Sequence, residues 1–502
     1  MSFHIEEIKT VRDLKIVGYK TRTIKDELRD NLISSLKRGE EYFSGIHGYE
    51  ETVIPDLKRA ILSRHNILFL GLRGQAKTRI ARTLVNLLDE YIPIIKGSEL
   101  MDDPFEPVSA YGKSQIVTHG DDTEIEWIHR DKRYTEKLAT PDVSVADLIG
   151  DVDPIKAAAL KLPYSDERVI HYGLIPRSHR SIFVINELPD LQARIQVALF
   201  NILQEEDIQI RGFKMKLPLD VQFIFTANPE DYTNRGSIVT PLKDRIDSQI
   251  LTHYPKSIEV SKNITKQEAK LHPEQSAQIT CSPLIEDLVE QVAFEARKSE
   301  FVDEKSGVSA RLTISSYENL FSSAELRCLE TSEKSTFIRI SDLFSTIPSI
   351  TGKIELVYEG EQEGPSTVAH LLISKAIRTI FQQYFPSPEK KGKKDEGKKV
   401  YAKILDWFAK GNKLDLMSYS TQKEYENSLL SVTGLMEIVQ EHVAGINKQE
   451  KFLFAEFLLH GMCEYSLISR FNLTGRFEFK DMLSSMFSLE DSGDDEFDQD
   501  KY

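Results

Sequence analysis

The sequence has few cysteines, no long apolar run and no excess of positive charge. Its three cysteines, Cys281, Cys328 and Cys463, are widely spaced and include no C-x-x-C pair, which favours separate thiols in a reducing compartment over a disulfide framework. No apolar run approaches the roughly 18–20 residues that cross a membrane. The N-terminus, M-S-F-H-I-E-E-I-K, lacks the apolar core of a secretory signal. We therefore expect a cytoplasmic protein without a membrane span.

The net charge of −15, from 64 basic and 79 acidic residues, argues against nucleic acid as the main partner, because phosphate binding needs a concentrated basic face. With 40% hydrophobic and 28% charged residues the composition is that of a globular protein. A chain of 502 residues is too long for one core, so two to four domains are expected.

The most informative stretch is N-I-L-F-L-G-L-R-G-Q-A-K-T, residues 66–78. An apolar strand, a glycine-bearing loop, Lys-Thr and a helical pattern form the arrangement that cradles phosphates. Lysine adds positive charge near the outer phosphates, and the threonine hydroxyl can bind Mg²⁺. The other interpretation is an ordinary strand-to-helix turn with a chance Lys-Thr. The candidate nucleotide-binding residues are Gly71, Leu72, Arg73, Gly74, Gln75, Ala76, Lys77 and Thr78.

One position departs from the usual G-x-x-x-x-G-K-[ST] pattern. Ala76 stands where that pattern has glycine. Its methyl group is either tolerated or narrows the loop and weakens nucleotide binding.

Further strands and helices alternate along the chain. Apolar strands are predicted at Ile67–Leu70, Ile182–Ile185 and Val221–Phe225, with another near Ile250. Amphipathic helices are predicted at 24–36 and 191–203, and a β-hairpin at 207–219. This alternation predicts an α/β fold in which a parallel sheet is flanked by helices and binds its ligand at the carboxyl ends of the strands.

The pattern becomes helical after about residue 256. Composition then divides the chain as a whole into segments. The first predicted segments are a helical lead-in at 1–45 and a nucleotide-binding core at 46–255, with an insertion of loops and one short strand (123–128) at about 92–136. A helical lid follows at 256–386, with an inserted mixed segment that includes a strand-like stretch at 353–357 and a glycine-bearing turn at 359–364. The last segments are a lysine-rich linker at 387–399, a C-terminal helical unit at 400–487 and an acidic, disordered tail at 488–502.

Polar residues recur where the predicted strands end. Asn186-Glu187 follows one strand, and Asn228 lies in T-A-N-P after the next. Glu187 is the candidate general base, and Asn186 and Thr78 are the candidate metal ligands. Asn228 is placed to hold the attacking water. Taken singly, Asn186-Glu187 is also a helix N-cap pair and Asn-Pro is also a turn signal.

Two arginines complete the set. Arg245, in P-L-K-D-R-I-D, is a candidate arginine finger that stabilises charge on the transferring phosphoryl group. The alternative for it is a surface salt bridge. Arg311, which opens a helix of the lid, is a second candidate contact to the nucleotide.

The order of these elements resembles that of AAA+ ATPases, and the details resemble the magnesium-chelatase ATPase subunit and the MoxR group. The segments that carry the likeness lie between about residues 45 and 330. They are D-L-I-G-D-V-D-P-I-K-A from Asp147, H-Y-G-L-I-P-R-S-H-R-S-I-F-V-I-N-E from His171, N-P-E-D-Y from Asn228 and L-K-D-R from Leu242. Asn186 departs from the family pattern, which has aspartate there.

The resemblance implies ATP and Mg²⁺ as cofactors and a homo-oligomeric ring, commonly a hexamer, in which Arg245 acts on the neighbour's nucleotide. It also implies that the hairpin at 207–219 faces the pore or a partner. Members of the group work with a von Willebrand A domain protein. Because no D-x-S-x-S motif occurs here, that partner is expected to be a separate chain.

The leading functional hypothesis is a chaperone-like ATPase that remodels a partner protein, with hydrolysis slowed by Ala76 and Asn186. One alternative is a nucleotide-gated assembly scaffold with little hydrolysis. Another is the ATPase subunit of a metal chelatase. A DNA-dependent motor or transcription activator is disfavoured by the net charge, the acidic tail and the absence of a G-A-F-T-G-A loop.

Overall fold

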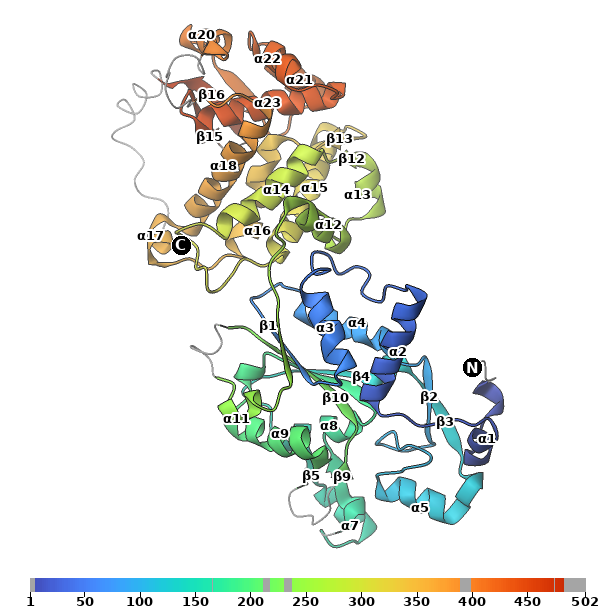
Figure 1. Ribbon diagram of the computed structural model, residues 1–502. Helices are drawn as coiled ribbons and strands as arrows, with labels where there is room; N and C mark the ends of the chain where they lie inside the picture. The colour runs from blue at the N-terminus through green and yellow to red at the C-terminus, as the bar shows by residue number, and fades with distance from the viewer. Residues whose placement is uncertain are drawn as a thin grey trace. The chain divides into compact units, whose positions relative to one another are not determined.

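The computed structural model describes residues 5–164, 166–210, 217–229, 237–388, 399–473 and 475–482. The chain forms two compact units, Met1–Tyr254 and Pro255–Tyr502. The first contains a parallel sheet and the second is mainly helical (Figure 1). The tip of the predicted hairpin (211–216), most of the predicted linker (389–398) and the predicted acidic tail lie outside the described residues.

A five-stranded parallel sheet forms the centre of the N-terminal unit, with strand order β11-β1-β10-β7-β4. Its strands are β1 (Ile67–Leu70), β4 (Tyr134–Leu138), β7 (Ser181–Asn186), β10 (Val221–Ala227) and β11 (Ser248–Leu251). Every residue of β7 and β10 is buried, which is why these strands read as continuous apolar runs. The four strands predicted from apolar runs are therefore confirmed.

Helices cover both faces of this sheet (Figure 1). Ile67 and Phe69 of β1 pack on one face with α2 (Ile24–Arg38), α3 (Val53–Leu62) and α4 (Lys77–Thr83). Leu68 points to the other face, where α9 (Ala193–Glu205) packs. Since side chains alternate along a strand, the three consecutive apolar residues 67–69 contribute to the apolar cores on both faces of the sheet.

The structure corrects the prediction of a loop-rich stretch before β7. The fifth strand of the sheet, β4, begins inside it, and so does the helix α5 (Ala110–His119). The short strand predicted at 123–128 is confirmed as β3 (Ile125–His129), which pairs antiparallel with β2 (Tyr91–Ile95). In α5 only Gly112 is buried, so this helix lacks the apolar stripe that marks a helix in a sequence. β4 reads Y-T-E-K-L because it is an edge strand and only half buried.

The remaining elements of this unit are short. They are η1 (Ile5–Glu7), α1 (Val11–Ile16), η2 (Leu84–Leu87), η3 (Gly120–Asp122), η4 (Arg130–Arg133), α6 (Val145–Leu148), β5 (Gly150–Val152), α7 (Pro154–Leu160), η5 (Glu167–Val169), β6 (Ile170–Tyr172), α8 (Leu174–Arg177), η6 (Leu188–Asp190), β8 (Asp207–Ile208), β9 (Leu217–Pro218) and α11 (Thr240–Lys243). The pairing of β8 with β9 confirms the base of the predicted hairpin.

A buried ion pair anchors helix α2 to the sheet. Arg133 donates two hydrogen bonds to the carboxylate of Glu27, at 2.7 and 2.6 Å, and a third to the carbonyl of Arg180 at 2.9 Å. Glu27 also accepts the backbone N–H of Asp89 at 2.7 Å. Because a buried charge needs such a full set of partners, the pair fixes how α2 lies on the sheet.

Asp220 receives the first backbone N–H of the same helix, with Ile24 N 2.8 Å from its Oδ2. Burial raises the pKa of Asp220 to about 6. A carboxyl whose folded pKa is raised loses its contribution to stability as pH rises from the unfolded pKa towards 6. Asp220→Asn keeps the acceptor but not the charge. We therefore compare the free energy of unfolding of this variant with that of the parent. The difference, variant minus parent, should be about 1 kcal/mol larger at pH 7.5 than at pH 5.

Urea denaturation at the two pH values measures this difference. Asp406→Asn, at an exposed aspartate, is the matched control and should show no pH-dependent gain. An equal gain at both pH values for Asp220→Asn would contradict the account of a buried carboxylate.

An apolar core in the described part of the C-terminal unit runs from Ile279 to Phe479 and joins the predicted lid to the predicted C-terminal segment. Its helices are α12 (Ile258–Glu268), α13 (Pro273–Gln278), α14 (Pro283–Ala296), α15 (Arg311–Thr331), η7 (Ile340–Thr346), α16 (Ile347–Thr351), α17 (Tyr358–Glu363), α18 (Pro365–Tyr384), α20 (Ala402–Ala409), α21 (Gln422–Leu430), α22 (Leu435–His442) and α23 (Lys448–Glu464). The helical character predicted here is confirmed.

Strands also occur in this unit, which the sequence analysis did not predict. β14 (Leu414–Met417), β16 (Arg476–Asp481) and β15 (Ile468–Leu473) form an antiparallel sheet in that order. β12 (Ile279–Thr280) and β13 (Thr336–Phe337) form a parallel pair. The strand predicted at 353–357 is wrong, since within this stretch only Leu356 makes a bridge, an isolated one to Val302. The glycine-bearing turn after it is the helix α17.

Within the described part of the chain, no helix is both long enough and apolar enough to cross a membrane. All three cysteines are free thiols, as predicted from their spacing. Burial raises the pKa of the Cys463 thiol to about 12, so this sulfur stays protonated and unreactive at neutral pH.

Candidate functional site

The loop between β1 and α4 is braced by the chain that follows β11. Thr252 donates its hydroxyl to Oε1 of buried Gln75 at 2.7 Å, and Tyr254 donates to the carbonyl of Arg73 at 2.9 Å. Gly71 lies against this contact, because a Cβ there would fall 2.0 Å from Oγ1 of Thr252 and 2.2 Å from Oε1 of Gln75. Only glycine fits at this position, so the packing fixes the shape of the loop.

Lys77 is buried, with 7% of its surface exposed. Its ammonium donates to the carbonyl oxygens of Gly71 and, at 3.1 Å, Leu72, and to Oδ1 of Asn228 at 2.7 Å. A lysine this deeply buried needs such acceptors, because an isolated ammonium in a low-dielectric site is costly. The structure therefore brings Lys77 and Asn228, 151 residues apart, into direct contact.

Ala76 adopts the left-handed conformation, with φ 57° and ψ 17°, directly before α4. Gly74, two residues earlier, also has a positive φ of 72°. Glycine adopts this region without strain, whereas a residue with a Cβ is disfavoured there by about 1–2 kcal/mol. The departure from the usual loop pattern thus falls at a position whose backbone favours glycine.

Ala76→Gly is expected to raise the free energy of unfolding by about 0.5 kcal/mol, since relief of the left-handed strain exceeds the added entropy of the unfolded chain. Ala158→Gly is the matched control, at an exposed position inside α7, and should lower the same quantity by about 0.5–1 kcal/mol. Chemical denaturation measures both. Equal destabilisation by the two substitutions would contradict strain at Ala76.

Asn186, at the end of β7, connects the loop to the sheet. Its Oδ1 accepts the hydroxyls of Thr78 at 3.1 Å and Thr226 at 3.0 Å. Its Nδ2 donates to Oε1 of Glu136 at 2.8 Å. The two predicted metal ligands, Thr78 and Asn186, are therefore adjacent, and the orientation of the amide is set by partners on both sides.

Glu187 follows with a left-handed backbone, φ 54° and ψ 51°. Its N–H donates to Oγ1 of Thr226 at 3.2 Å, and its Oε2 accepts Nδ2 of Asn228 at 3.1 Å. Asn228 thus bridges Lys77 and Glu187. A non-glycine residue held in this conformation stores about 1–3 kcal/mol and is typical of functional sites.

Arg245 lies on the surface formed by α9 and α11. Its guanidinium donates to Oε1 of Gln204 at 3.0 Å and to the carbonyl of Pro241 at 2.7 Å, and its central carbon lies 5.2 Å from the centre of the Phe200 ring. These contacts hold the side chain at the surface of the N-terminal unit. Arg311 is the exposed first residue of α15, in the C-terminal unit.

Three residues of this site were missed by the sequence analysis. Thr226 is the last but one residue of β10 and Thr252 directly follows β11, so their position at the carboxyl ends of two predicted strands could have identified them. Glu136 had no such signal, because β4 is polar and was placed in a loop-rich stretch. Each of the three is hydrogen bonded to a predicted site residue.

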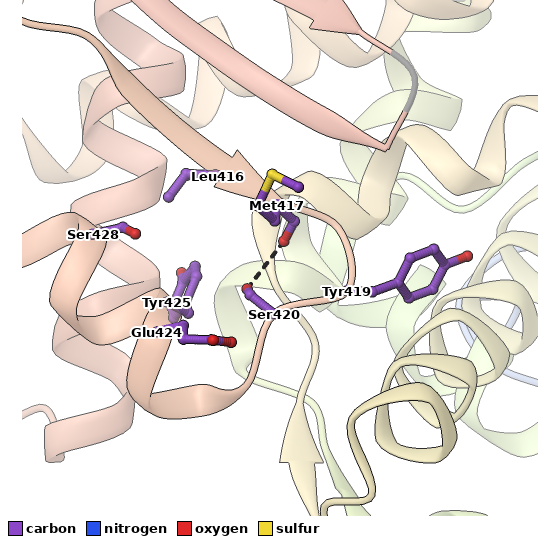
Figure 2. Close-up of a pocket in the computed structure, with 7 residues that line it drawn as sticks. All are labelled: Leu416, Met417, Tyr419, Ser420, Glu424, Tyr425 and Ser428. Carbon is purple, nitrogen blue, oxygen red and sulfur yellow. Dashed lines mark hydrogen bonds between the residues drawn. The ribbon is translucent and has the colours of Figure 1, made fainter.

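A cavity of about 380 Å³ lies elsewhere, in the C-terminal unit. Figure 2 shows it between the end of β14 and α21, with the Ser420 hydroxyl donating to the carbonyl of Met417 at 3.0 Å. Tyr425 and Glu424 also line it. Their polar atoms bond to Glu456 and to the N-cap Thr421 within the unit, so they serve the structure of this unit. The cavity contains none of the predicted site residues.

The oxygens at the β7 end suit a hydrated Mg²⁺ ion. A threonine hydroxyl, an amide oxygen and a nearby carboxylate are oxygen donors of the kind Mg²⁺ prefers, and Mg²⁺ keeps several waters beside substrate phosphates. No cluster of three or more histidine, cysteine, aspartate or glutamate ligands occurs among the described residues. The donor set therefore fits a metal that is shared with a phosphate ligand.

No model of a known protein family matches the chain, and no curated protein does. Solved structures are similar at low identity. A chain in a complex between subunits BchI and BchD of magnesium chelatase shares 17% identity with this chain, with 64% of this chain and 98% of that chain covered and a TM-score of 0.32. Hsp104 bound to ATPγS and casein shares 13%, with 65% and 53% covered and a TM-score of 0.37.

NtrX from Brucella abortus shares 14% identity over 58% of this chain, with a TM-score of 0.31, and this chain spans only 55% of NtrX. Since these scores are low, the fold class is assigned from the strand order and from the alternation of strands and helices along the chain. The N-terminal unit has an α/β fold with a central parallel sheet flanked by helices. The predicted α/β fold class is confirmed.

Proposed function

We propose that this protein is an ATPase that binds ATP with Mg²⁺ at the carboxyl ends of β1, β7 and β10. The observation that carries the proposal is the chain of contacts from Lys77 through Asn228 to Glu187. A cation for the phosphates and a carboxylate for the water are held by one amide. An ordinary strand-to-helix turn has no need of such a connection.

The residues have distinct roles in this account. Backbone N–H groups of residues 71–76 and the ammonium of Lys77 bind the phosphates. Thr78 and Asn186 hold the hydrated Mg²⁺, which neutralises charge on the phosphate oxygens when bound. Glu187 accepts a proton from the water that attacks the γ-phosphorus, and Asn228 fixes the carboxylate in position. The bond from the γ-phosphorus to its bridging oxygen breaks, and ADP leaves.

Arg245 acts as an arginine finger on the nucleotide of a neighbouring subunit in a ring, commonly a hexamer. This role is supported by the position of Arg245 on the surface of α9 and α11, where it contacts Gln204 and Phe200. Arg311 of the lid is a second contact to the nucleotide. Mixing Arg245→Ala subunits with Glu187→Gln subunits should restore turnover at interfaces that combine one intact finger with one intact base. No recovery at any mixing ratio would contradict a shared site.

The work done by hydrolysis is remodelling of a partner protein, in the manner of the magnesium-chelatase and MoxR type. The quoted segments at Asp147, His171, Asn228 and Leu242 support this type. A separate von Willebrand A domain protein is the expected partner. Capture of that partner by a Glu187→Gln variant held in its ATP state tests this part.

A second candidate is a nucleotide-gated scaffold with little hydrolysis, and Asn186 favours it because an amide supplies no negative charge to the metal. Phosphate release by the purified full chain with ATP and Mg²⁺ separates the two. The ATPase predicts steady release. ATP-dependent assembly with release no faster than in buffer would favour the scaffold. Dependence of an associated chelatase reaction on this chain would favour a chelatase subunit.

A further inference from the structure

Glu136 lies on β4, the strand that pairs with β7, and its side chain contacts Asn186, the residue that ends β7. The two strands are parallel, with Glu136 opposite Val184 and Leu138 opposite Asn186. Oε1 of Glu136 accepts the amide of Asn186 at 2.8 Å. Its side chain is 23% exposed. A carboxylate is therefore hydrogen bonded to the side chain of residue 186, the position at which the family pattern has aspartate.

The hydrogen bond has a direct consequence for the amide. With Nδ2 of Asn186 directed to Glu136, Oδ1 is turned towards Thr78 and Thr226, which both donate to it. The amide thus presents its oxygen to the predicted metal ligand Thr78. The carboxylate of Glu136, which is hydrogen bonded to the nitrogen, polarises this amide. Outer-shell carboxylates that orient a ligand in this way typically change metal affinity by about 10–100-fold.

We propose that Glu136 supplies, through Asn186, the negative charge that the Mg²⁺ shell lacks at position 186. Glu136 is a positioning residue in this account, which rests on the proposed ATP site. The pair also explains why asparagine stands at 186. An aspartate there would place a second carboxylate within hydrogen-bond distance of Glu136, and two like charges so close oppose each other.

The competing explanation is that Glu136 only makes a surface ion pair. Its Oε2 accepts Arg82 at 3.0 Å from Nε and 2.9 Å from the terminal nitrogen, and Tyr134 at 3.0 Å. The Arg82 side chain is 64% exposed, and exposed pairs contribute little to stability. Arg82 and Asn186 bind different oxygens of the carboxylate. Removal of Arg82 therefore leaves the contact to Asn186 in place and provides a matched control.

The test compares the affinity of the full chain for a fluorescent ATP analogue in Mg²⁺ and in EDTA. For the parent, Mg²⁺ is expected to tighten binding. In Glu136→Gln this tightening should fall about 10-fold, while affinity in EDTA changes little. Arg82→Gln should behave like the parent. Asn186→Asp should show less tightening than the parent, and Asn186→Asp combined with Glu136→Gln should recover it, because the charge is then at position 186.

The outcomes separate the two proposals. No binding of the analogue by the parent would contradict the ATP site itself. Binding by the parent with an unchanged Mg²⁺ effect in Glu136→Gln, or an equal loss in Arg82→Gln, would overturn the role of Glu136 alone. Thermal melts identify any variant that does not fold. If Glu136→Gln does not fold, Asn186→Asp provides the test. Stronger tightening of analogue binding by Mg²⁺ in Asn186→Asp than in the parent would also overturn the role of Glu136.

Discussion

Replacement of Lys77 by alanine should weaken ATP binding by about 100-fold. The ammonium is buried and is held by two loop carbonyls and Asn228. In the proposed site it is therefore fixed beside the phosphates of ATP. Loss of one partner from a desolvated charge pair costs about 3 kcal/mol, which corresponds to about 100-fold in affinity. Calorimetric titration of ATP into the two proteins measures the change.

A matched control is needed because the substitution also removes hydrogen bonds within the loop. Lys113→Ala removes the same charge from an exposed position on α5 and should leave the affinity for ATP unchanged. A thermal melt confirms that Lys77→Ala is folded. A folded Lys77→Ala protein that binds ATP as tightly as the parent would contradict the assignment of the phosphate loop.

Glu187→Gln should lower the rate of phosphate release by about 10²–10⁴-fold and leave ATP affinity within about threefold. In the parent, Nδ2 of Asn228 lies 3.1 Å from Oε2 of Glu187. A glutamine oxygen can still accept this hydrogen bond. The amide cannot accept a proton from water, so only the step that needs a general base is lost. Phosphate release at saturating ATP and equilibrium binding, measured on one preparation, separate the two effects.

Glu205→Gln makes the same change at an exposed residue of α9 and should retain the parent's rate. If Glu187→Gln retained that rate too, another group would have to act as the base. If it lost ATP binding as well as turnover, Glu187 would serve mainly to hold Asn228 and Lys77 in place.

Much of the fold could be predicted from its apolar runs. The central strands β1, β7 and β10 carry uninterrupted apolar residues because both faces of the sheet are covered by helices. β4 could not be found in this way, since an edge strand needs only partial burial. The strands β14, β15 and β16 were missed although R-F-E-F-K-D in β16 alternates in the manner of a strand.

The candidate site was predictable where its residues follow such strands. Lys77, Asn186, Glu187 and Asn228 were identified in the sequence. Asn228 is hydrogen bonded to both Lys77 and Glu187, and Thr226 connects Glu187 to Asn186. Glu136 was not, because its relation to Asn186 depends on the pairing of β4 with β7. That pairing brings together residues 50 apart, and no local pattern encodes it.

The central claim is that the strand-end site binds ATP, and calorimetric titration of ATP with Mg²⁺ into the full parent chain tests it most directly. The account predicts saturable binding of one ATP per chain that Lys77→Ala abolishes over the same concentration range. Absence of saturable binding, or equal binding by the parent and a folded Lys77→Ala variant, would contradict it.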